Sequence, residues 1–297
     1  MGNPEFWLGP MEGVMTPELL EAATSLHLVK RWMTPFFRVN ADAPKPKTLK
    51  AFLAPFGGEL PVTVQLMGVS PEAMAMTAQT LSQLGVNAFN LNFGCPSRQV
   101  TSGGAGGGAL RNIDGMLRTV ETVKNAIGDL ELSVKIRTGW SDPGEQELFL
   151  PRLVASGCVG KFFIHYRTVK EQYAGVDGRE ERLKRAIELA ENVPVILNGD
   201  VNTPDDSESL LKRLPQAAGI MCARGWLHDP FLLRRLEHLP APDPETGREQ
   251  FFRTVVKAGF PVNKSIELSN YIWGRKNNPY FRHLLTLPAG AAFRLSP

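Results

Sequence analysis

The segment 193–213, VPVILNGDVNTPDDSESLLKR, contains one complete unit of the predicted fold. Residues Val193–Leu197 form a short apolar run, as expected for a strand buried on both faces. The polar residues Asn198–Asp200 follow it, and Thr203 before Pro204 pairs a helix-capping residue with a proline suited to the first helical turn. The segment therefore predicts a strand, a loop and a helix in that order.

The same alternation recurs over residues 1–240. Thr16 and Ser70 also precede prolines, Gly85 and Gly128 stand where helices should end, and Met116, Val120, Val123 and Ile127 share one helical face. The other expected strands are Phe6–Leu8, Thr34–Val39, Pro61–Leu66, Ala88–Leu91, Leu132–Ile136, Phe162–Ile164 and Gly219–Met221. Eight strands alternating with helices predict an α/β fold, a (β/α)8 TIM barrel. The alternative is an open doubly wound sheet, but the GxGxxG fingerprint of that fold does not follow the first strand.

The last part of the chain differs in composition. Residues 240–247, PAPDPETG, have the composition of a linker, and the amphipathic stretches Phe251–Lys257 and Ser265–Trp273 predict a small helical domain over residues 241–297. That region holds eight Lys or Arg against four Asp or Glu, whereas the rest of the chain is nearly neutral. A basic appendage indicates a polyanionic partner, although a solvated helix face would explain the same charges.

Composition excludes several classes of protein. The chain has 297 residues, 43% of them hydrophobic and 21% charged, which is typical of a globular protein. No apolar run approaches the roughly 20 residues of a membrane-spanning helix, so we expect no membrane association. The chain shows no secretion signal, and its three cysteines are too scattered for a disulfide framework or a metal site. We therefore expect a cytoplasmic protein without a metal ion.

Polar residues end or follow all eight expected strands, the end at which barrels of this kind carry their active sites. The need to satisfy loop backbone groups could explain any one of them, but the whole set predicts an active site. The set comprises Glu12, Arg38, Asn40, Gln65, Asn92, Cys95, Lys135, Arg137, His165, Arg167, Asn198, Asp200 and Arg224.

Residue types at these strand ends predict a flavin site. Asn198–Asp200 and Ala223–Gly225 follow the seventh and eighth strands, where this fold often binds phosphate. The glycine run Gly103–Gly108, interrupted by one alanine, could also present N–H groups to phosphate. Lys135 would place a cation beside an anion or an electron-rich ring, and together these features indicate flavin mononucleotide (FMN). Cys95 lies in the loop sequence NFGCP and is a candidate proton donor.

These motifs resemble those of the tRNA-dihydrouridine synthases. The resemblance covers the whole barrel and rests on GPMEGV at 9–14, VQLMG at 64–68, NFGCPS at 92–97, VKIR at 134–137, IHYRT at 164–168, NGD at 198–200 and ARG at 223–225. The segments MEGV and FFRV are most similar to the bacterial C-type subgroup. The chain departs from the family pattern at Tyr166 and Ala223, where glycine is usual, in a longer glycine-rich loop and in a short tail.

The resemblance implies an FMN-bearing barrel joined to a helical domain that helps hold tRNA. It also implies NADPH-dependent reduction of a tRNA uridine, which we expect in the D-loop, at its C5–C6 double bond. It implies Cys95 as the acid that protonates C5, opposite the hydride added to C6. The implied FMN contacts are Pro10, Met11, Glu12, Gln65, Lys135, His165, Asn198, Gly199, Asp200, Ala223 and Arg224. For the RNA substrate we expect contacts from Asn92, Arg38, Lys264, Arg275, Lys276 and Arg282, and we expect a monomer.

Two other functions stay open at this point. An FMN-dependent barrel oxidoreductase acting on a free pyrimidine, as in the dihydroorotate dehydrogenases, would share the lysine, asparagine and phosphate loops but would not need a basic tail. An RNA-binding module with weak or lost catalysis would need the basic tail, but it would not need Cys95 and Lys135.

Overall fold

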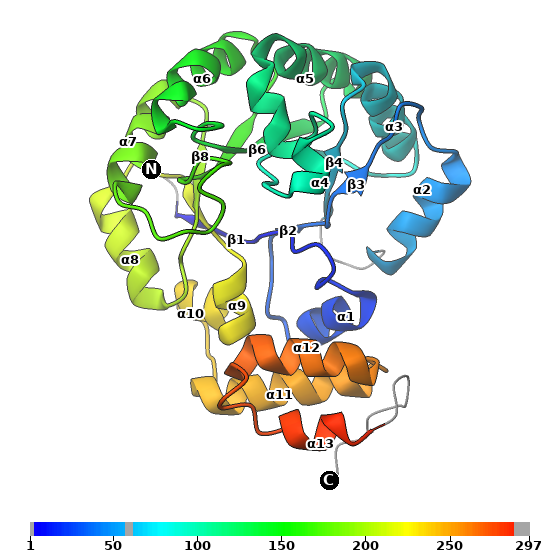
Figure 1. Cartoon of the computed structure of the whole chain (residues 1–297), viewed down its shortest axis with the longest axis vertical. Helices are drawn as coiled ribbons and strands as arrows, with labels where there is room; N and C mark the ends of the chain where they lie inside the picture. Colours follow the sequence, from blue (N-terminus) through cyan, green and yellow to red (C-terminus); the bar gives the residue numbers. More distant parts are fainter. Residues whose placement is uncertain (1–2, 57–61, 288–297) are drawn as a thin grey trace.

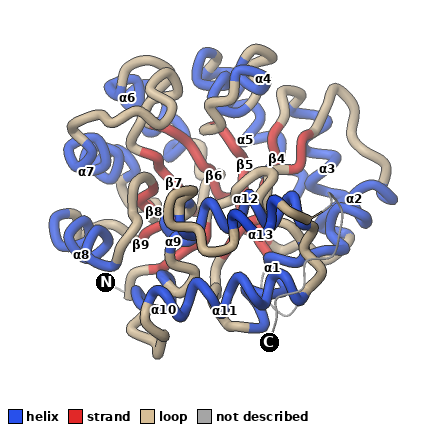
Figure 2. The backbone as a smooth tube through the Cα atoms, turned by 60° about the horizontal axis from the view of Figure 1, so that its bottom comes forward, coloured by secondary structure: helices blue, strands red, loops and turns tan. Residues whose placement is uncertain are grey.

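Eight parallel strands close into a barrel surrounded by helices (Figures 1 and 2). The structure is a computed structural model and describes residues 3–56 and 62–287. Strand β1 (Glu5–Leu8) pairs with β9 (Gly219–Cys222) and with β2 (Trp32–Met33), and β2 also pairs with β4 (Val62–Met67), which closes the ring. The remaining strands of the ring are β5 (Ala88–Phe93), β6 (Glu131–Arg137), β7 (Lys161–His165) and β8 (Val195–Asn198). The predicted barrel is confirmed, and the open-sheet alternative is wrong because β2 pairs with both β1 and β4 and so closes the ring.

The second strand differs from its expected range of 34–39. It begins earlier, at Trp32, and continues as a separate short strand, β3 (Phe37–Arg38), which pairs only with β4. Pro35 lies between the two pieces and has no N–H to donate to the ladder, so the strand is interrupted there. The third expected strand runs on to Met67, and its expected first residue, Pro61, lies outside the described residues.

The helices begin where the capping residues predict. The side chains of Thr16, Ser70 and Thr203 each accept a hydrogen bond from a backbone N–H in the first turn that follows. The helices around the barrel are α1 (Pro17–Ser25), α2 (Pro46–Leu53), α3 (Pro71–Gln83), α4 (Arg98–Thr101), α5 (Ile113–Ile127), α6 (Gln146–Ala155), α7 (Arg179–Ala190), α8 (Pro204–Arg213), α9 (Arg224–His228) and α10 (Leu232–Leu236). Short 3-10 turns cover Ala54–Phe56, Gly106–Arg111 and Pro143–Glu145. No helix in the described part of the chain is both long and apolar enough to cross a membrane.

A small apolar layer fills the barrel below its C-terminal end. Trp7, Met33, Phe163, Ile196 and Met221 come from five strands and form a core cluster of their own. The Trp7 and Phe163 rings meet edge to face, with their centroids 5.0 Å apart. Side chains alternate along a strand, so residues two positions further along point into the same interior. Two positions beyond Trp7, Phe163 and Ile196 stand Gly9, which directly follows β1, and the polar residues His165 and Asn198, which end β7 and β8.

The chain ends in three helices that pack beside α1 and α9 (Figure 1): α11 (Pro244–Lys257), α12 (Val262–Trp273) and α13 (Phe281–Leu285). Phe251 is fully buried, and its ring meets Trp226 of α9 edge to face at 5.2 Å. Trp273 and Tyr280 both pack against Phe252, so these aromatic rings belong to the helical core. The amphipathic stretches are confirmed as helices, while the division of the chain at residue 240 stays a prediction.

Candidate active site

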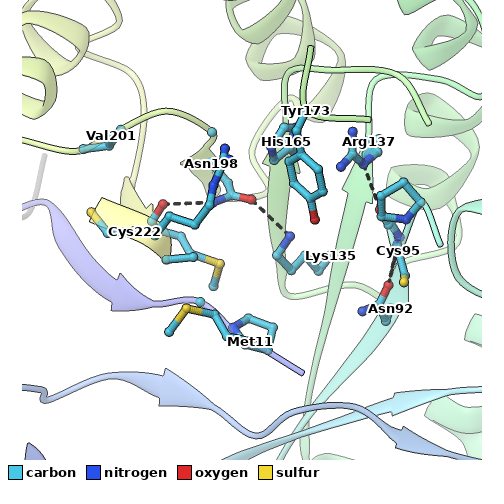
Figure 3. A pocket seen from close by; sticks show the side chains of 18 of the residues that line it. Met11, Asn92, Cys95, Lys135, Arg137, His165, Tyr173, Asn198, Val201 and Cys222 are labelled. Atoms are coloured by element: carbon cyan, nitrogen blue, oxygen red, sulfur yellow. Dashed lines mark hydrogen bonds between the residues drawn. The ribbon is translucent and has the colours of Figure 1, made fainter. Parts of the chain in front are cut away.

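A cavity of about 310 Å³ opens at the C-terminal ends of the strands (Figure 3). This volume lies at the small end of the range typical of ligand sites. All eight strands of the ring, or the loops that follow them, contribute to its lining. The lining includes every residue expected to contact FMN, namely Pro10, Met11, Glu12, Gln65, Lys135, His165, Asn198, Gly199, Asp200, Ala223 and Arg224, together with Asn92 and Cys95. The structure thus brings the predicted residues together, while their roles stay predictions.

Lys135 lies on the inner wall of the barrel and points to Asn198 (Figure 3). Its Nζ donates a hydrogen bond of 3.1 Å to Asn198 Oδ1, and Asn198 Nδ2 in turn donates to the carbonyl of Met221 at 3.0 Å. Burial, with a smaller contribution from the nearby Arg137 cation, lowers the pKa of Lys135 to about 8, although Cys95 acts in the opposite direction. The amine is therefore charged at neutral pH and becomes neutral in mildly alkaline solution.

The loop that carries Cys95 is fixed by two side chains. Asn92 Oδ1 accepts hydrogen bonds from the backbone N–H groups of Gly94 and Cys95, both at 3.0 Å. Arg137 Nε donates to the carbonyl of Gly94 at 2.8 Å. Asn92 also donates from Nδ2 to Gln65 Oε1 at 2.8 Å, so its oxygen and one of its N–H groups are used within the protein. Cys95 is partly exposed and lines the cavity, held in one position by these contacts.

The glycine run Gly103–Gly108 packs against the loop of Cys95. None of its residues lines the cavity, and Gly107 donates its N–H to the carbonyl of Cys95 at 3.0 Å. A Cβ atom on Gly107 would lie 2.6 Å from Val169 and 2.9 Å from the Cys95 carbonyl. These glycines let the chain pack closely against the loop of Cys95, and a contribution of the run to phosphate binding stays a prediction.

His165 is a neutral hydrogen-bond donor. Its Nδ1 accepts the backbone N–H of Arg167 at 3.2 Å, which leaves the ring proton on Nε2. Burial, reinforced by the Arg137 and Lys135 cations, lowers the pKa of His165 well below its usual value. The ring therefore stays uncharged at neutral pH and offers one N–H group.

Gly199 and Gly225 form close turns at the cavity wall, in the segments that follow β8 and β9. Gly199 has a φ of +116°, and a Cβ atom there would lie 2.6 Å from the Tyr166 ring and 3.3 Å from His165 Nε2. A Cβ atom on Gly225 would lie 2.3 Å from the carbonyl of Val201. Glycine is therefore required at these two positions by the packing of the protein itself, and their contact with a phosphate stays a prediction.

Asp200 is the acidic group between these turns. Its carboxylate accepts hydrogen bonds from the Tyr166 hydroxyl at 2.6 Å, from Arg167 at 2.5 Å and from Arg224 at 3.3 Å. Burial alone would raise the pKa of Asp200, but the hydrogen bonds from Arg167 and Tyr166 outweigh it and lower the pKa. The carboxylate therefore stays ionised and offsets part of the positive charge around the cavity.

Several lining residues were not assigned a role from the sequence. Tyr173 is 56% exposed, and its ring lies 5.5 Å from the Arg137 guanidinium carbon and 4.9 Å from that of Arg224 (Figure 3). The others are Gly9, Phe36, Gly94, Pro96, Val201, Asn202, Met221 and Cys222. Tyr173 lies in the long loop after β7, and its position after a barrel strand is the one sequence feature that could have indicated it.

Five of the residues expected to contact the RNA lie outside the cavity lining. Arg38 is exposed at the end of β3. Lys264 of α12 donates to the carbonyl of Gly13 and to Glu267, both at 3.2 Å, so the helical region reaches the loop after β1. The exposed cations Arg275, Lys276 and Arg282 lie on the last part of the chain, where Arg275 covers the Phe281 ring at 5.2 Å.

The family of the chain follows from comparison with known proteins. A family model described as "Dihydrouridine synthase (Dus)" matches residues 7–258, which include the whole barrel and every lining residue of the cavity. The chain belongs to the dihydrouridine synthase family.

Individual Dus relatives are about 30% identical to this chain over the matched regions. A probable tRNA-dihydrouridine synthase of Rhodobacter capsulatus is 32% identical over 194 residues, 65% of this chain and 58% of that protein. The tRNA-dihydrouridine synthase B of Pseudomonas aeruginosa is 29% identical over 64% of this chain and 58% of its own length. A tRNA-dihydrouridine(16) synthase of Vibrio vulnificus is 28% identical over 78% of this chain and 74% of its own length. The matched region thus spans less than two thirds of the first two relatives.

Solved structures of similar shape agree with the fold. An old yellow enzyme homologue from Zymomonas mobilis has a TM-score of 0.57 and 14% identity, over 80% of this chain and 89% of that one. Morphinone reductase in complex with tetrahydroNAD has a TM-score of 0.54 and 12% identity, over 81% and 89% of the two chains. At this level of identity the likeness concerns the barrel alone.

The turn at Gly199 gives a first prediction for this Dus-family chain. Gly199→Ala places a side chain in the left-handed region of φ and against the Tyr166 ring, so we expect the free energy of unfolding to fall by about 1–3 kcal/mol. Gly175→Ala is the control, because a Cβ atom there meets nothing within 4 Å. Urea unfolding of both variants measures the difference, and equal losses would contradict the close packing behind Gly199.

Proposed function

We propose that this chain reduces a uridine of tRNA to 5,6-dihydrouridine, with FMN as its cofactor and NADPH as the reductant. The observation that carries the proposal is the meeting of Cys95, Lys135 and Asn198 in one cavity of a barrel whose sequence matches the Dus family over residues 7–258. The name of the Vibrio vulnificus relative specifies position 16 of tRNA, which supports a uridine of the D-loop as the target.

The residues of the cavity suit a flavin phosphate. Gly199 and Gly225 line the cavity, and the close turns that they allow place backbone groups at its wall, where N–H groups can donate to a phosphate. Arg224 and the N–H group of His165 lie on the same side and can donate to phosphate oxygens. Lys135 supplies a further cation deeper in the barrel. FMN bound here would supply the hydride that is added to carbon C6 of the uracil ring.

Cys95 supplies the matching proton in this proposal. One hydride at C6 and one proton at C5 complete the reduction of the double bond, so the protein needs a single acid at the correct position. Asn92 and Arg137 hold the loop of Cys95 by hydrogen bonds of 2.8–3.0 Å, which fixes the thiol relative to Lys135. The target base leaves its stack to enter the cavity, and a loop nucleotide does so at low cost.

We assign catalysis to residues 1–240 and tRNA binding mainly to the helical region 241–297. Arg275, Lys276 and Arg282 of this region are exposed, and Lys264 connects α12 to the loop that contains Glu12. We also expect a cytoplasmic monomer of the C-type subgroup, because tRNA is modified in that compartment and the segments MEGV and FFRV are of this type.

Purified protein tests this function directly. We expect a yellow preparation with a flavin spectrum that converts uridine to dihydrouridine in an unmodified tRNA transcript when NADPH is added, as measured by nucleoside mass spectrometry. Reduction of free uridine but not of tRNA would favour a free-pyrimidine oxidoreductase. Binding of tRNA without any bound flavin would favour an RNA-binding module.

Cys95→Ala separates the proton donor from the flavin site. We expect the rate of tRNA reduction to fall by a factor of about 10²–10⁴, the usual contribution of a general acid, while FMN retention and flavin reduction by NADPH stay unchanged. Cys158→Ala is the control, because Cys158 lies outside the cavity lining. Single-turnover mass spectrometry measures the product, and a normal rate in Cys95→Ala would remove Cys95 from this role.

Lys135 predicts a pH dependence of FMN retention. The amine is charged below its pKa of about 8 and neutral above it, so FMN affinity should fall as the pH rises through this value. Lys135→Met should bind FMN more weakly at pH 7 and lose this change, while Lys184→Met, an exposed residue of α7, should behave as the wild type. Flavin fluorescence titrations between pH 6.5 and 9.5, values bracketing that pKa, measure the FMN affinity of each variant. If the affinity of Lys135→Met fell with pH as that of the wild type does, another group would cause the pH dependence.

The tail cations predict a salt dependence of tRNA binding. Each phosphate contact contributes about −0.7 to −0.9 to the slope of log affinity against log salt concentration. Arg275→Gln with Lys276→Gln should therefore weaken binding to all tRNAs and flatten the slope by about one to two units. Lys184→Gln with Lys212→Gln, on α7 and α8, is the charge-matched control. An unchanged slope in the tail variant would move the binding surface to the barrel, toward Arg31, Arg38, Lys45 and Lys47.

A further inference from the structure

Tyr166 lies directly behind the turn at Gly199 and Asp200. The side chain is buried, with 3% of its surface exposed, and its ring is parallel to that of His165, with an interplanar angle of 6° and centroids 5.5 Å apart. The ring fills the space that a Cβ atom of Gly199 would take. Tyr166 is therefore in contact with both the glycine turn and the histidine of the cavity wall.

The hydroxyl of Tyr166 is directed at Asp200. It donates to Asp200 Oδ2 at 2.6 Å, and Arg167 Nη2 donates to the same oxygen at 2.5 Å. Asp200 Oδ1 accepts only the longer, 3.3 Å contact from Arg224 among the bonds found in the described residues. Asp200 has a φ of +50°, which a residue other than glycine adopts only where its surroundings hold it.

This arrangement resolves an electrostatic conflict in the cavity. A carboxylate beside a phosphate site repels the phosphate and competes with it for nearby arginines. Tyr166 and Arg167 both donate to Oδ2, which holds the carboxylate and offsets its charge. The carboxylate therefore depends less on a hydrogen bond from Arg224. The side chain of Arg224 stays 54% exposed at the cavity and is available to a ligand.

We propose that Tyr166 is a positioning residue for the phosphate of the flavin, because its hydroxyl holds the Asp200 carboxylate and keeps Arg224 free for that phosphate. The inference rests on the proposed FMN-dependent function and extends it to a residue that does not line the cavity. It requires that the hydroxyl, and not the ring, determines how much more tightly the site binds FMN than a flavin without a phosphate.

Tyr166→Phe tests this requirement, because it removes the hydroxyl and keeps the ring that fills the space behind Gly199. Protein stripped of flavin is titrated with FMN and with riboflavin, which has the same ring system but no phosphate. We expect FMN to bind about fivefold more weakly to Tyr166→Phe, the equivalent of one net hydrogen bond, and riboflavin affinity to change by less than about twofold. Equal weakening of both flavins, or no change in FMN affinity, would overturn the inference.

A second background tests whether Tyr166 acts through Asp200. In Asp200→Asn the charge that must be offset is gone, so adding Tyr166→Phe should change FMN affinity by less than about twofold. The same fivefold loss in both backgrounds would show that the hydroxyl acts elsewhere. Wild-type protein that binds neither flavin would overturn the proposed function together with the inference. If wild-type protein binds FMN and reduces tRNA, but Tyr166→Phe weakens both flavins equally or leaves FMN affinity unchanged, only the inference would be overturned.

Discussion

The pairing of the two-residue strand β2 with both β1 and β4 closes the sheet, and the site depends on this closure. An open sheet would spread its strand ends along an edge, whereas the barrel gathers the C-terminal ends of all eight strands around one opening. Lys135 of β6 therefore meets Asn198 of β8 at 3.1 Å although 63 residues separate them in the chain. The apolar layer of Trp7 and Phe163 fills the barrel below this opening.

The inside of the barrel is organised by charge as well as by shape. Lys135, Arg137, His165 and Arg224 line the cavity, and buried Arg167 lies just outside its lining. Burial is the main cause that lowers the pKa of Lys135 and keeps His165 neutral, and repulsion from the neighbouring cations adds to it. The Asp200 carboxylate offsets part of this positive charge. The phosphate of the proposed cofactor would relieve the repulsion that remains.

Much of the fold could be predicted from the sequence because its signals are local. Thr16, Ser70 and Thr203 cap helices through bonds to residues three positions away, and apolar runs mark strands that are buried on both faces. The strand interrupted at Pro35 was placed wrongly, because its pairing depends on β4, about 30 residues further along the chain. The residues expected to contact FMN do lie in one cavity, whereas Arg38, Asn40 and Arg167 of the predicted strand-end set lie outside its lining. Tyr173 and the packing role of Gly107 were missed, because each depends on a distant partner, Arg224 or Val169, that no local pattern indicates.

The C-terminal helices contact the chain next to residues that line the cavity. Phe251 of α11 packs on Trp226, which lies two residues after Arg224 in the same helix α9. Lys264 of α12 binds the carbonyl of Gly13, the residue after Glu12 of the cavity lining. Helices α11 and α12 therefore contact the chain beside two of the strand ends that form the cavity, those of β1 and β9. In the proposed function, a tRNA bound to these helices would lie next to the opening of the barrel, where its target base would enter the cavity.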